Sequence, residues 1–129
     1  MAGFSDYYEN TIINHLLRNQ AFTPPATIYV ALFTTAPADD GTGSVEVSGG
    51  AYARQTVTLS AAALGATSNS ADITYPTATA NWGTVVAAGL FDALTVGNLL
   101  AWANLAASKV VNSGDVFKFL TGDLDFTVD

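Results

Sequence analysis

The chain has 129 residues, no cysteine, and a formal net charge of −7 from four basic and eleven acidic side chains. Without cysteine, disulfide frameworks and thiolate metal sites are excluded, and four scattered cations among so many carboxylates argue against a nucleic-acid partner. Half of the residues are hydrophobic and only 12% are charged, so we expect either a Thr- and Ser-rich exterior or a surface that is buried in an assembly.

Residues 1–129 are short enough for a single domain, with a helix predicted within residues 1–20. The helix, over residues 5–19, has a capping serine, acidic residues in its first turn and a basic residue in its last: Ser5, Asp6, Glu9 and Arg18. Its apolar stripe consists of Phe4, Tyr8, Ile12 and Leu16. We expect this stripe to cover an open end of the sandwich; in the alternative, the rest of the helix, with Tyr7, contacts another protein.

Residues 1–10 lack the charge and apolar block of a signal peptide, and no apolar run approaches the ~18 residues of a membrane helix. We therefore expect a soluble chain, made in the cytosol, with no membrane partner.

A strand is predicted over residues 27–34, where apolar side chains point to both faces. The sandwich is expected to span residues 27–129, interrupted by a long exposed loop over residues 36–50. Three acidic residues of this loop, Asp39, Asp40 and Glu46, make it a candidate partner-facing segment, and a mobile hairpin loop is the alternative.

The central hairpin is predicted over residues 81–105, with arms at 84–92 and 99–105. Alternation puts Val85 with Ala87 on one face and Val86 with Ala88 on the other, so both faces are apolar. A second sheet or a helix must cover one face, and another subunit is a candidate for the other.

The remaining strands are expected at 52–59, 71–75, 108–111, 116–120 and 124–128, with a connecting loop over 60–70 and the last two strands paired as a hairpin. The fold class is therefore mainly β: a single antiparallel β-sandwich, jelly-roll-like, of seven or eight strands with one N-terminal α-helix.

The sequence contains no catalytic signature, and we expect no enzyme activity, no metal and no cofactor. His15, the sole histidine, lacks a carboxylate at helical spacing. Asp123 and Asp125 share one face of a strand, where they could hold a hard cation or simply discourage edge pairing by their charge. A hydrolase that uses such exposed carboxylates is the enzymatic alternative.

Aromatic side chains suggest possible contacts. Trp102 lies in an apolar strand and is expected in the core, whereas Trp82 is either core or an exposed stacking platform. The candidate interface residues are Phe4, Tyr7, Tyr8, Asp39, Asp40, Glu46 and Trp82.

Several segments are distributed along nearly the whole chain, among them GFSDYYEN at residue 3, TPPATIYVALFTTAP at residue 23, GGAYAR at residue 49 and ITYPTATANWGTV at residue 73. Together they resemble a family of small virion proteins of tailed bacteriophages, often labelled phage tail fibre proteins. The resemblance implies a structural component of the virion without a catalytic site, assembled in the host cytoplasm. It transfers no functional residues.

A fibre normally needs a repetitive shaft or a coiled coil, which these residues do not provide. We therefore expect a capsid decoration, or cement, protein that stabilises the shell by bridging major capsid protein subunits and that also contacts copies of itself, with a trimer as one arrangement. The alternative is a tail or tail-fibre module that contacts the host surface, where a glycan is the candidate partner.

Overall fold

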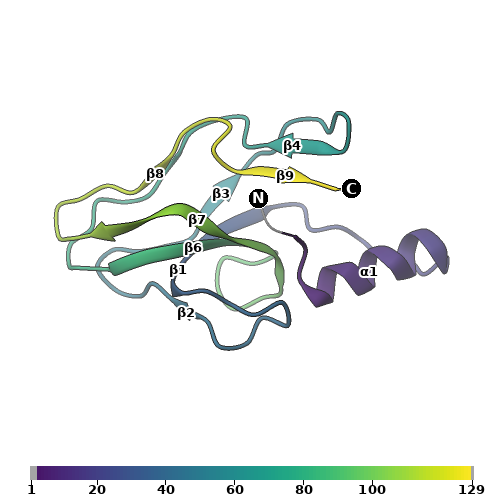
Figure 1. The fold of residues 1–129 in the computed structure, drawn as a ribbon, viewed down its shortest axis with the longest axis horizontal. Helices are drawn as coiled ribbons and strands as arrows, with labels where there is room; N and C mark the ends of the chain where they lie inside the picture. Colours follow the sequence, from purple (N-terminus) through teal and green to yellow (C-terminus); the bar gives the residue numbers. More distant parts are fainter. Residues whose placement is uncertain (1–2, 129) are drawn as a thin grey trace.

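A five-stranded antiparallel sheet forms the centre of the molecule in the computed structural model, which describes residues 3–128 (Figure 1). Its long strands are β1 (Ile28–Thr35), β6 (Gly83–Phe91) and β7 (Leu99–Val111), and the short strands β2 (Val45–Glu46) and β3 (Gln55–Val57) share the other edge of β1. The prediction of a central hairpin is confirmed by β6 and β7, but β7 also includes residues 108–111, which the sequence suggested as a separate piece.

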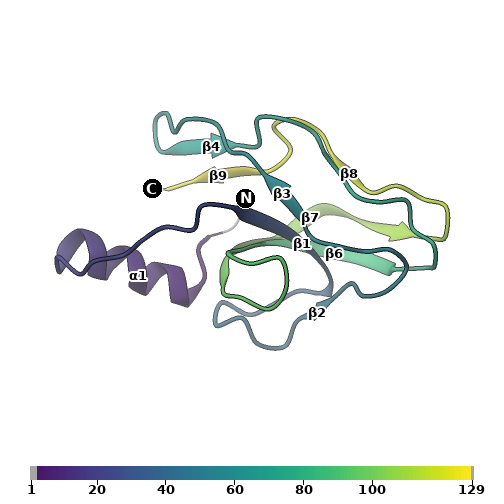
Figure 2. The same ribbon diagram turned by 180° about the vertical axis from the view of Figure 1, so that it is seen from behind.

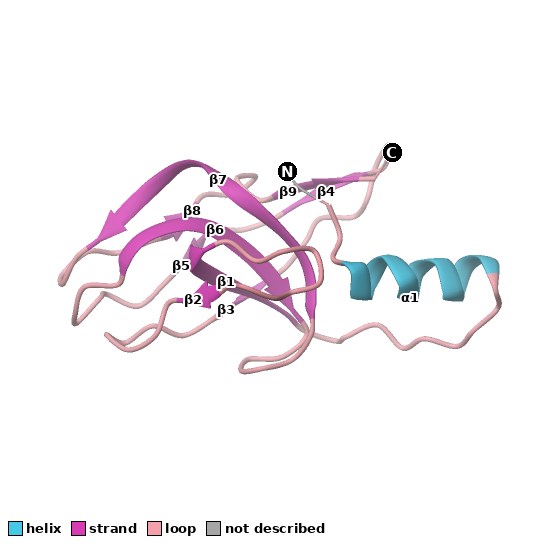
Figure 3. Cartoon of the chain, turned by 60° about the horizontal axis from the view of Figure 1, so that its bottom comes forward, coloured by secondary structure: helices cyan, strands magenta, loops and turns pink. Residues whose placement is uncertain are grey.

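Two short antiparallel ladders form the second layer (Figure 3). In one ladder β4 (Ala66–Ser68) pairs with β9 (Asp125–Thr127), and in the other β5 (Ile73–Thr74) pairs with β8 (Lys118–Phe119). Their apolar side chains pack with those of the central sheet into one core that includes Val30, Leu32, Tyr75, Val85, Phe117 and Phe126. The fold is therefore mainly β, and the predicted β-sandwich with one N-terminal helix is confirmed.

The pairing of the last two strands differs from the prediction, because β8 and β9 pair with earlier strands instead of with each other. The side chain of Asn69, which is 1% exposed, explains this difference. Its Oδ1 accepts hydrogen bonds from the backbone N–H groups of Gly122 and Leu124, and its Nδ2 donates to the carbonyls of Ala71 and Leu120. These bonds fix residues 120–124 as a turn against β4, so each flanking strand meets a different partner.

Two segments that the sequence indicated as loops contribute strands. The segment 36–50 contains β2, and Val47 after it is only 4% exposed. The segment 60–70 contains β4. The described residues therefore form nine strands instead of seven or eight.

A wide bulge in β7 changes which side chains of β6 share a face. Val85 pairs with Lys109 and Ala87 with Asn104, so residues 105–108 of β7 lie opposite Val86 alone. As a result Val85 joins Ala88 in the main core, while Val86 packs beside Ala87 in a second cluster. The predicted grouping of Val85 with Ala87 is therefore wrong, because an unequal number of residues breaks the period-two alternation.

The second face of the sheet is covered by segments of the same chain. Its small cluster contains Phe33 and Phe91, whose ring centroids are 6.1 Å apart. The guanidinium carbon of Arg54 lies 3.8 Å from the centroid of the Phe91 ring and covers it. The part of this face that Arg54 covers therefore needs no other subunit.

Gly89 of β6 lies against Leu99 and Phe33, and its replacement by alanine is expected to be destabilising. A Cβ at this position would lie 2.9 Å from Leu99 Cδ1 and 2.9 Å from Phe33 Cε2. Overpacking of this kind lowers the free energy of unfolding by about 2 kcal/mol. Urea denaturation of Gly89→Ala measures it, with Gly3→Ala as control because a Cβ there has no neighbour within 4 Å. Equal stability of the two variants would contradict the packing described here.

The helix α1 (Asp6–Leu17) begins at the predicted cap, since Ser5 Oγ accepts a hydrogen bond from the backbone N–H of Tyr8. It projects from one end of the sandwich instead of covering it (Figures 1 and 2). None of its residues is buried, and Phe4 and Tyr8 alone join the core, at the base of the helix. The expectation that the whole apolar stripe covers the sandwich is therefore wrong.

Candidate interaction surfaces

The candidate interface residues separate into two groups and one buried side chain. Tyr7, Asp39, Asp40 and Glu46 all line one polar cavity of about 340 Å³ at the base of the helix. Phe4 and Tyr8 instead line an apolar groove of about 390 Å³ beside Pro24 and Phe126. Trp82 lies in neither.

The ring of Trp82 is 6% exposed and belongs to the main core. Its Nε1 donates a hydrogen bond to the carbonyl of Gly50, and its ring packs edge-on against Tyr52 and Tyr75. The structure thus corrects the interpretation of Trp82 as an exposed platform. The aromatic cluster buries the ring because Gly50, which has no Cβ, lets the backbone approach it closely.

The acidic residues of the polar cavity are tied to neighbouring elements. Asp39 Oδ1 accepts a hydrogen bond from Trp102 Nε1 at 3.0 Å, and its carbonyl accepts one from the backbone N–H of Asp6 at 2.9 Å. Trp102 is therefore half-buried at the surface, which corrects the expectation that it belongs to the core. These two bonds hold the 36–44 loop against the helix and β7, so the loop has a fixed position on the surface.

Asp40 lies in the turn of the same loop. Hydrogen bonds from the side chain and the backbone N–H of Thr42 lower the pKa of the Asp40 carboxyl below its ordinary value. The carboxylate is therefore charged at neutral pH, and it faces solvent at the rim of the polar cavity.

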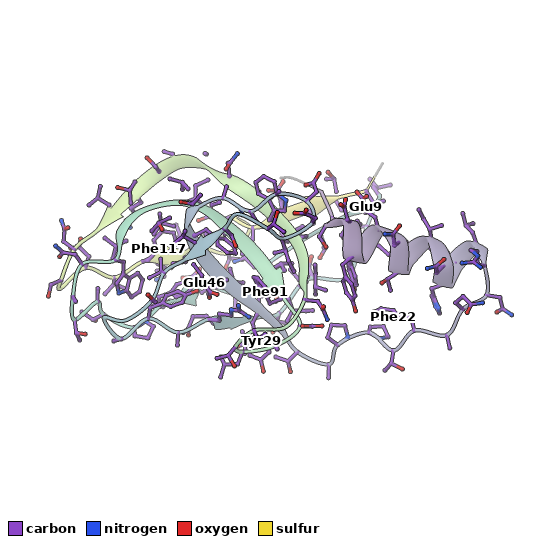
Figure 4. The ribbon with its side chains drawn as sticks, turned by 90° about the horizontal axis from the view of Figure 1, so that it is seen from below. Glu9, Phe22, Tyr29, Glu46, Phe91 and Phe117 are labelled. Carbon is purple, nitrogen blue, oxygen red and sulfur yellow. The ribbon has the colours of Figure 1, made fainter. Side chains whose placement is uncertain are left out.

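Arg54 and Glu46 form the inner wall of the polar cavity. Arg54 Nη2 and Nε donate to the two carboxylate oxygens of Glu46 at 2.8 and 2.9 Å, while Nη1 donates to the carbonyls of Ala93 and Val96. The hydroxyl of Tyr52 also donates to Glu46. Figure 4 shows Glu46 beside Phe91, the ring that Arg54 covers. The charge of Glu46 is thus compensated within the fold.

The apolar groove lies between the base of α1 and the β4–β9 ladder, and no charged side chain lines it. The rings of Phe4 and Tyr8 meet edge-on, with centroids 5.4 Å apart. Burial raises the pKa of the Tyr8 hydroxyl. Both residues therefore anchor the helix to the sandwich and leave a strip of apolar surface beside it.

Ser5 connects the helix to the sheet, and the Ser5→Ala variant is expected to be less stable than the wild type. The buried hydroxyl of Ser5 donates to the carbonyl of Leu99 and caps the helix. Loss of a cap and of a buried partner lowers the free energy of unfolding by about 1–2 kcal/mol. Urea denaturation followed by circular dichroism measures the change, with Ser70→Ala as control because its exposed hydroxyl also donates to one carbonyl. Equal losses in both variants would contradict a special role for Ser5.

The helix and the return segment after it form an arm, residues 5–25. Figure 4 shows Phe22 of the return segment beside α1. Its ring packs edge-on against Tyr8 and His15, and His15 Nδ1 lies 2.9 Å from the carbonyl oxygen of Gln20. His15 therefore holds the arm together and has no carboxylate beside it.

A third surface, the β7–β8 groove, lies between the bulged part of β7 and the segment that contains β8 and β9. It encloses about 500 Å³. Phe117, Phe119 and Leu124 form its floor, and Lys109, Asp123 and Asp125 lie at its rim. Sequence reasoning placed the two aspartates on one face but did not find the groove. No local pattern in the sequence indicates the groove, because its floor and its rim come from segments that meet only in the folded chain.

Among residues 3–128, no three His, Asp or Glu side chains are grouped so that they could hold a metal ion. Asp123 Oδ2 accepts a hydrogen bond from the backbone N–H of Leu120, which caps a turn. No helix in this part of the chain is long and apolar enough to cross a membrane.

The described residues thus form a small, mainly β sandwich domain with a projecting helical arm. The family model described as "Podophage GP4 fiber I protein gp80" matches residues 3–127, so the chain belongs to this family of phage fibre proteins. The match confirms the resemblance to structural proteins of the phage virion. None of the curated proteins matches the chain.

Proposed function

We propose that the chain is a structural subunit of a phage fibre, which is incorporated into the virion and acts by binding other subunits, without catalysis. The description of its family as a fibre protein supports this role. The projecting arm supports it too, because a helix that buries no residue in its own domain is suited to contact another one.

The observation that carries the proposal is the exposed apolar face of the arm. Leu16 and Leu17 are 70% and 80% exposed and share this face with Ile13. Single apolar side chains such as Leu64 are exposed on the sandwich too, but the three on the arm follow helical spacing on one short helix. Apolar side chains that project this far indicate a contact that forms on assembly.

Capsid decoration is the second candidate. It is favoured by the absence of a shaft in residues 3–128, where the longest helix has twelve residues and the strands form a single sandwich. In this role the arm or the acidic 36–44 loop would bridge subunits of the major capsid protein, and the added contacts would stabilise the shell.

Cryo-electron microscopy of the intact virion tests both candidates. Density for the sandwich within a fibre would support the first proposal, and density on the shell lattice would replace it with the second. Virions that lack the protein provide the control: an unchanged temperature of genome release together with missing fibres is expected for a fibre subunit. A lower release temperature with intact fibres would support decoration.

A further inference from the structure

β7 forms one edge of the central sheet (Figure 3), because within residues 3–128 it pairs with β6 on one side and with no other strand along its length. An unpaired strand edge offers its backbone N–H and C=O groups to other extended chains, and β7 has thirteen residues. The opposite edge consists of β2 and β3, which have only two and three residues. The β7 edge is therefore the place where the sheet could extend into a second copy of the chain.

The first part of the β7 edge is covered by the N-terminal residues of the same chain. The backbone N–H of Ser5 donates a hydrogen bond to the Leu100 carbonyl at 2.8 Å. The backbone N–H of Trp102 donates to the Gly3 carbonyl at 3.4 Å. The N-terminal residues thus take the place that a neighbouring strand would occupy.

The middle part of the β7 edge is bulged. Residues 105–108 lie opposite Val86 alone, so their backbone departs from regular strand geometry. A partner strand needs donors and acceptors at the regular spacing of a ladder, and a bulge of this size interrupts that spacing. This part is therefore a poor template for strand addition.

The last part of β7 has regular geometry again and keeps an open edge. Its final three residues pair in register with β6, and the carbonyl of Val111 accepts a hydrogen bond from the backbone N–H of Trp82 on that side. Because backbone groups alternate along a strand, the N–H and C=O of Val110 face away from β6. The edge around Val110 is therefore available to a strand of another copy.

Lys109 lies at this open edge, on the core-facing side of the sheet. It pairs with the fully buried Val85, and directly paired residues of antiparallel strands project to the same face. The Lys109 ammonium lies 5.3 Å from the centroid of the buried Phe117 ring. Lys109 is nevertheless exposed, because it lines the open β7–β8 groove. Its charge is therefore hydrated through the open side of the sandwich.

We propose that Lys109 prevents a strand of another copy from pairing with the end of β7. An added strand would cover the β7–β8 groove and remove water from the ammonium. Lys109 takes part in neither of the two ion pairs within residues 3–128, so its charge would be buried without a partner. Burial of an unpaired charge costs more free energy than the few backbone hydrogen bonds at this edge contribute. Copies of the chain therefore join through side-chain surfaces and not by extension of the sheet.

The carboxylates of Asp123 and Asp125 give the competing interpretation, because they line the same groove as Lys109. An added strand that pushed the ammonium toward them would create an ion pair, and the charge would then be satisfied. In that case the wild-type chain would associate through β7, and loss of the lysine would weaken the association. The two interpretations thus predict opposite effects of the same substitution.

Sedimentation velocity of the purified chain over a concentration series distinguishes them. Lys109→Thr should strengthen self-association at least about tenfold relative to the wild type, because threonine suits an edge strand and carries no charge. The matched control is Arg18→Thr, which changes the net charge equally but lies outside the sheet, at the end of the helix. Lys109→Arg keeps the charge and should associate as the wild type does.

A second substitution locates the contact. Val110→Pro removes an N–H that faces away from β6, which is the position where an edge strand tolerates proline. Combined with Lys109→Thr, it should return self-association to the wild-type level. Circular dichroism verifies that each variant keeps the wild-type fold.

Three results would overturn the inference. The first is a Lys109→Thr variant that associates no more strongly than Arg18→Thr. The second is association of Lys109→Thr that Val110→Pro does not reduce, and the third is a Lys109→Thr variant that associates more weakly than the wild type. All of these measurements use the isolated chain, so they can refute this inference without bearing on whether the protein is found in the fibre.

Discussion

Arg54→Met is expected to lower the free energy of unfolding by about 3 kcal/mol. Arg54 is 7% exposed and donates four hydrogen bonds, two to Glu46 and one each to the carbonyls of Ala93 and Val96. Methionine fills much of the same space over Phe91 but leaves Glu46 without its cation. Breaking one partner of a buried pair is costly because the other charge remains in a poorly solvated place.

Urea denaturation measures this effect, and Lys118→Met is the matched control. Lys118 pairs with Asp72 at 3.3 Å, but both side chains are more than 40% exposed. An exposed pair contributes at most about 1 kcal/mol. If both variants lost the same stability, Arg54 would not be the link between β2 and the 92–98 turn that its contacts indicate.

Alkaline pH is expected to destabilise the protein steeply through two core tyrosines. Burial raises the pKa of Tyr75, and burial together with the hydrogen bond to Glu46 raises the pKa of Tyr52, both well above the ordinary value of 10.0. Their rings are stacked, with centroids 6.1 Å apart, and the Tyr75 hydroxyl donates to the carbonyl of Val30.

The direction follows from proton binding. Above pH 10 the unfolded chain loses both phenolic protons while the folded chain keeps them, so stability is fully present below pH 10 and falls as pH rises. With two such groups, the free energy of unfolding is expected to fall by about 2.7 kcal/mol for each pH unit above this pH.

Urea titrations between about pH 9 and 11.5 measure the slope. The matched control is Tyr52→Phe with Tyr75→Phe, which costs stability at neutral pH but should lose most of the additional alkaline slope. Equal slopes in the wild type and the double variant would mean that other groups dominate alkaline unfolding.

The sequence predicted features that depend on neighbouring residues. The helix begins at Ser5 because a cap needs only the next three residues. Alternating apolar side chains predicted β1, and the same pattern with a turn predicted the β6–β7 hairpin. Four of the candidate interface residues, among them Tyr7 and Asp39, line one cavity because the 36–44 loop is docked on the helix.

The sequence could not predict features that depend on distant contacts. Arg54 is buried because Glu46, Ala93 and Val96 converge on it from three separate segments. The β7–β8 groove exists because a bulge at residues 105–108 lifts β7 beside aromatic residues that follow later in the chain. Neither feature leaves a local pattern.

The sequence by itself determined that this protein is a small, acidic, mainly β domain, because composition, strand periodicity and helix capping are local properties. Its resemblance to phage virion proteins came from whole segments and not from these properties. Only the tertiary structure decided the position of the helix. The apolar stripe predicted a helix that packs on its sandwich, yet Phe4 and Tyr8 alone reach the core. Whether a stripe packs depends on where the chain meets the sheet, and here Ser5 ties the helix to the first residue of β7, so that Leu16 and Leu17 project beyond the sandwich.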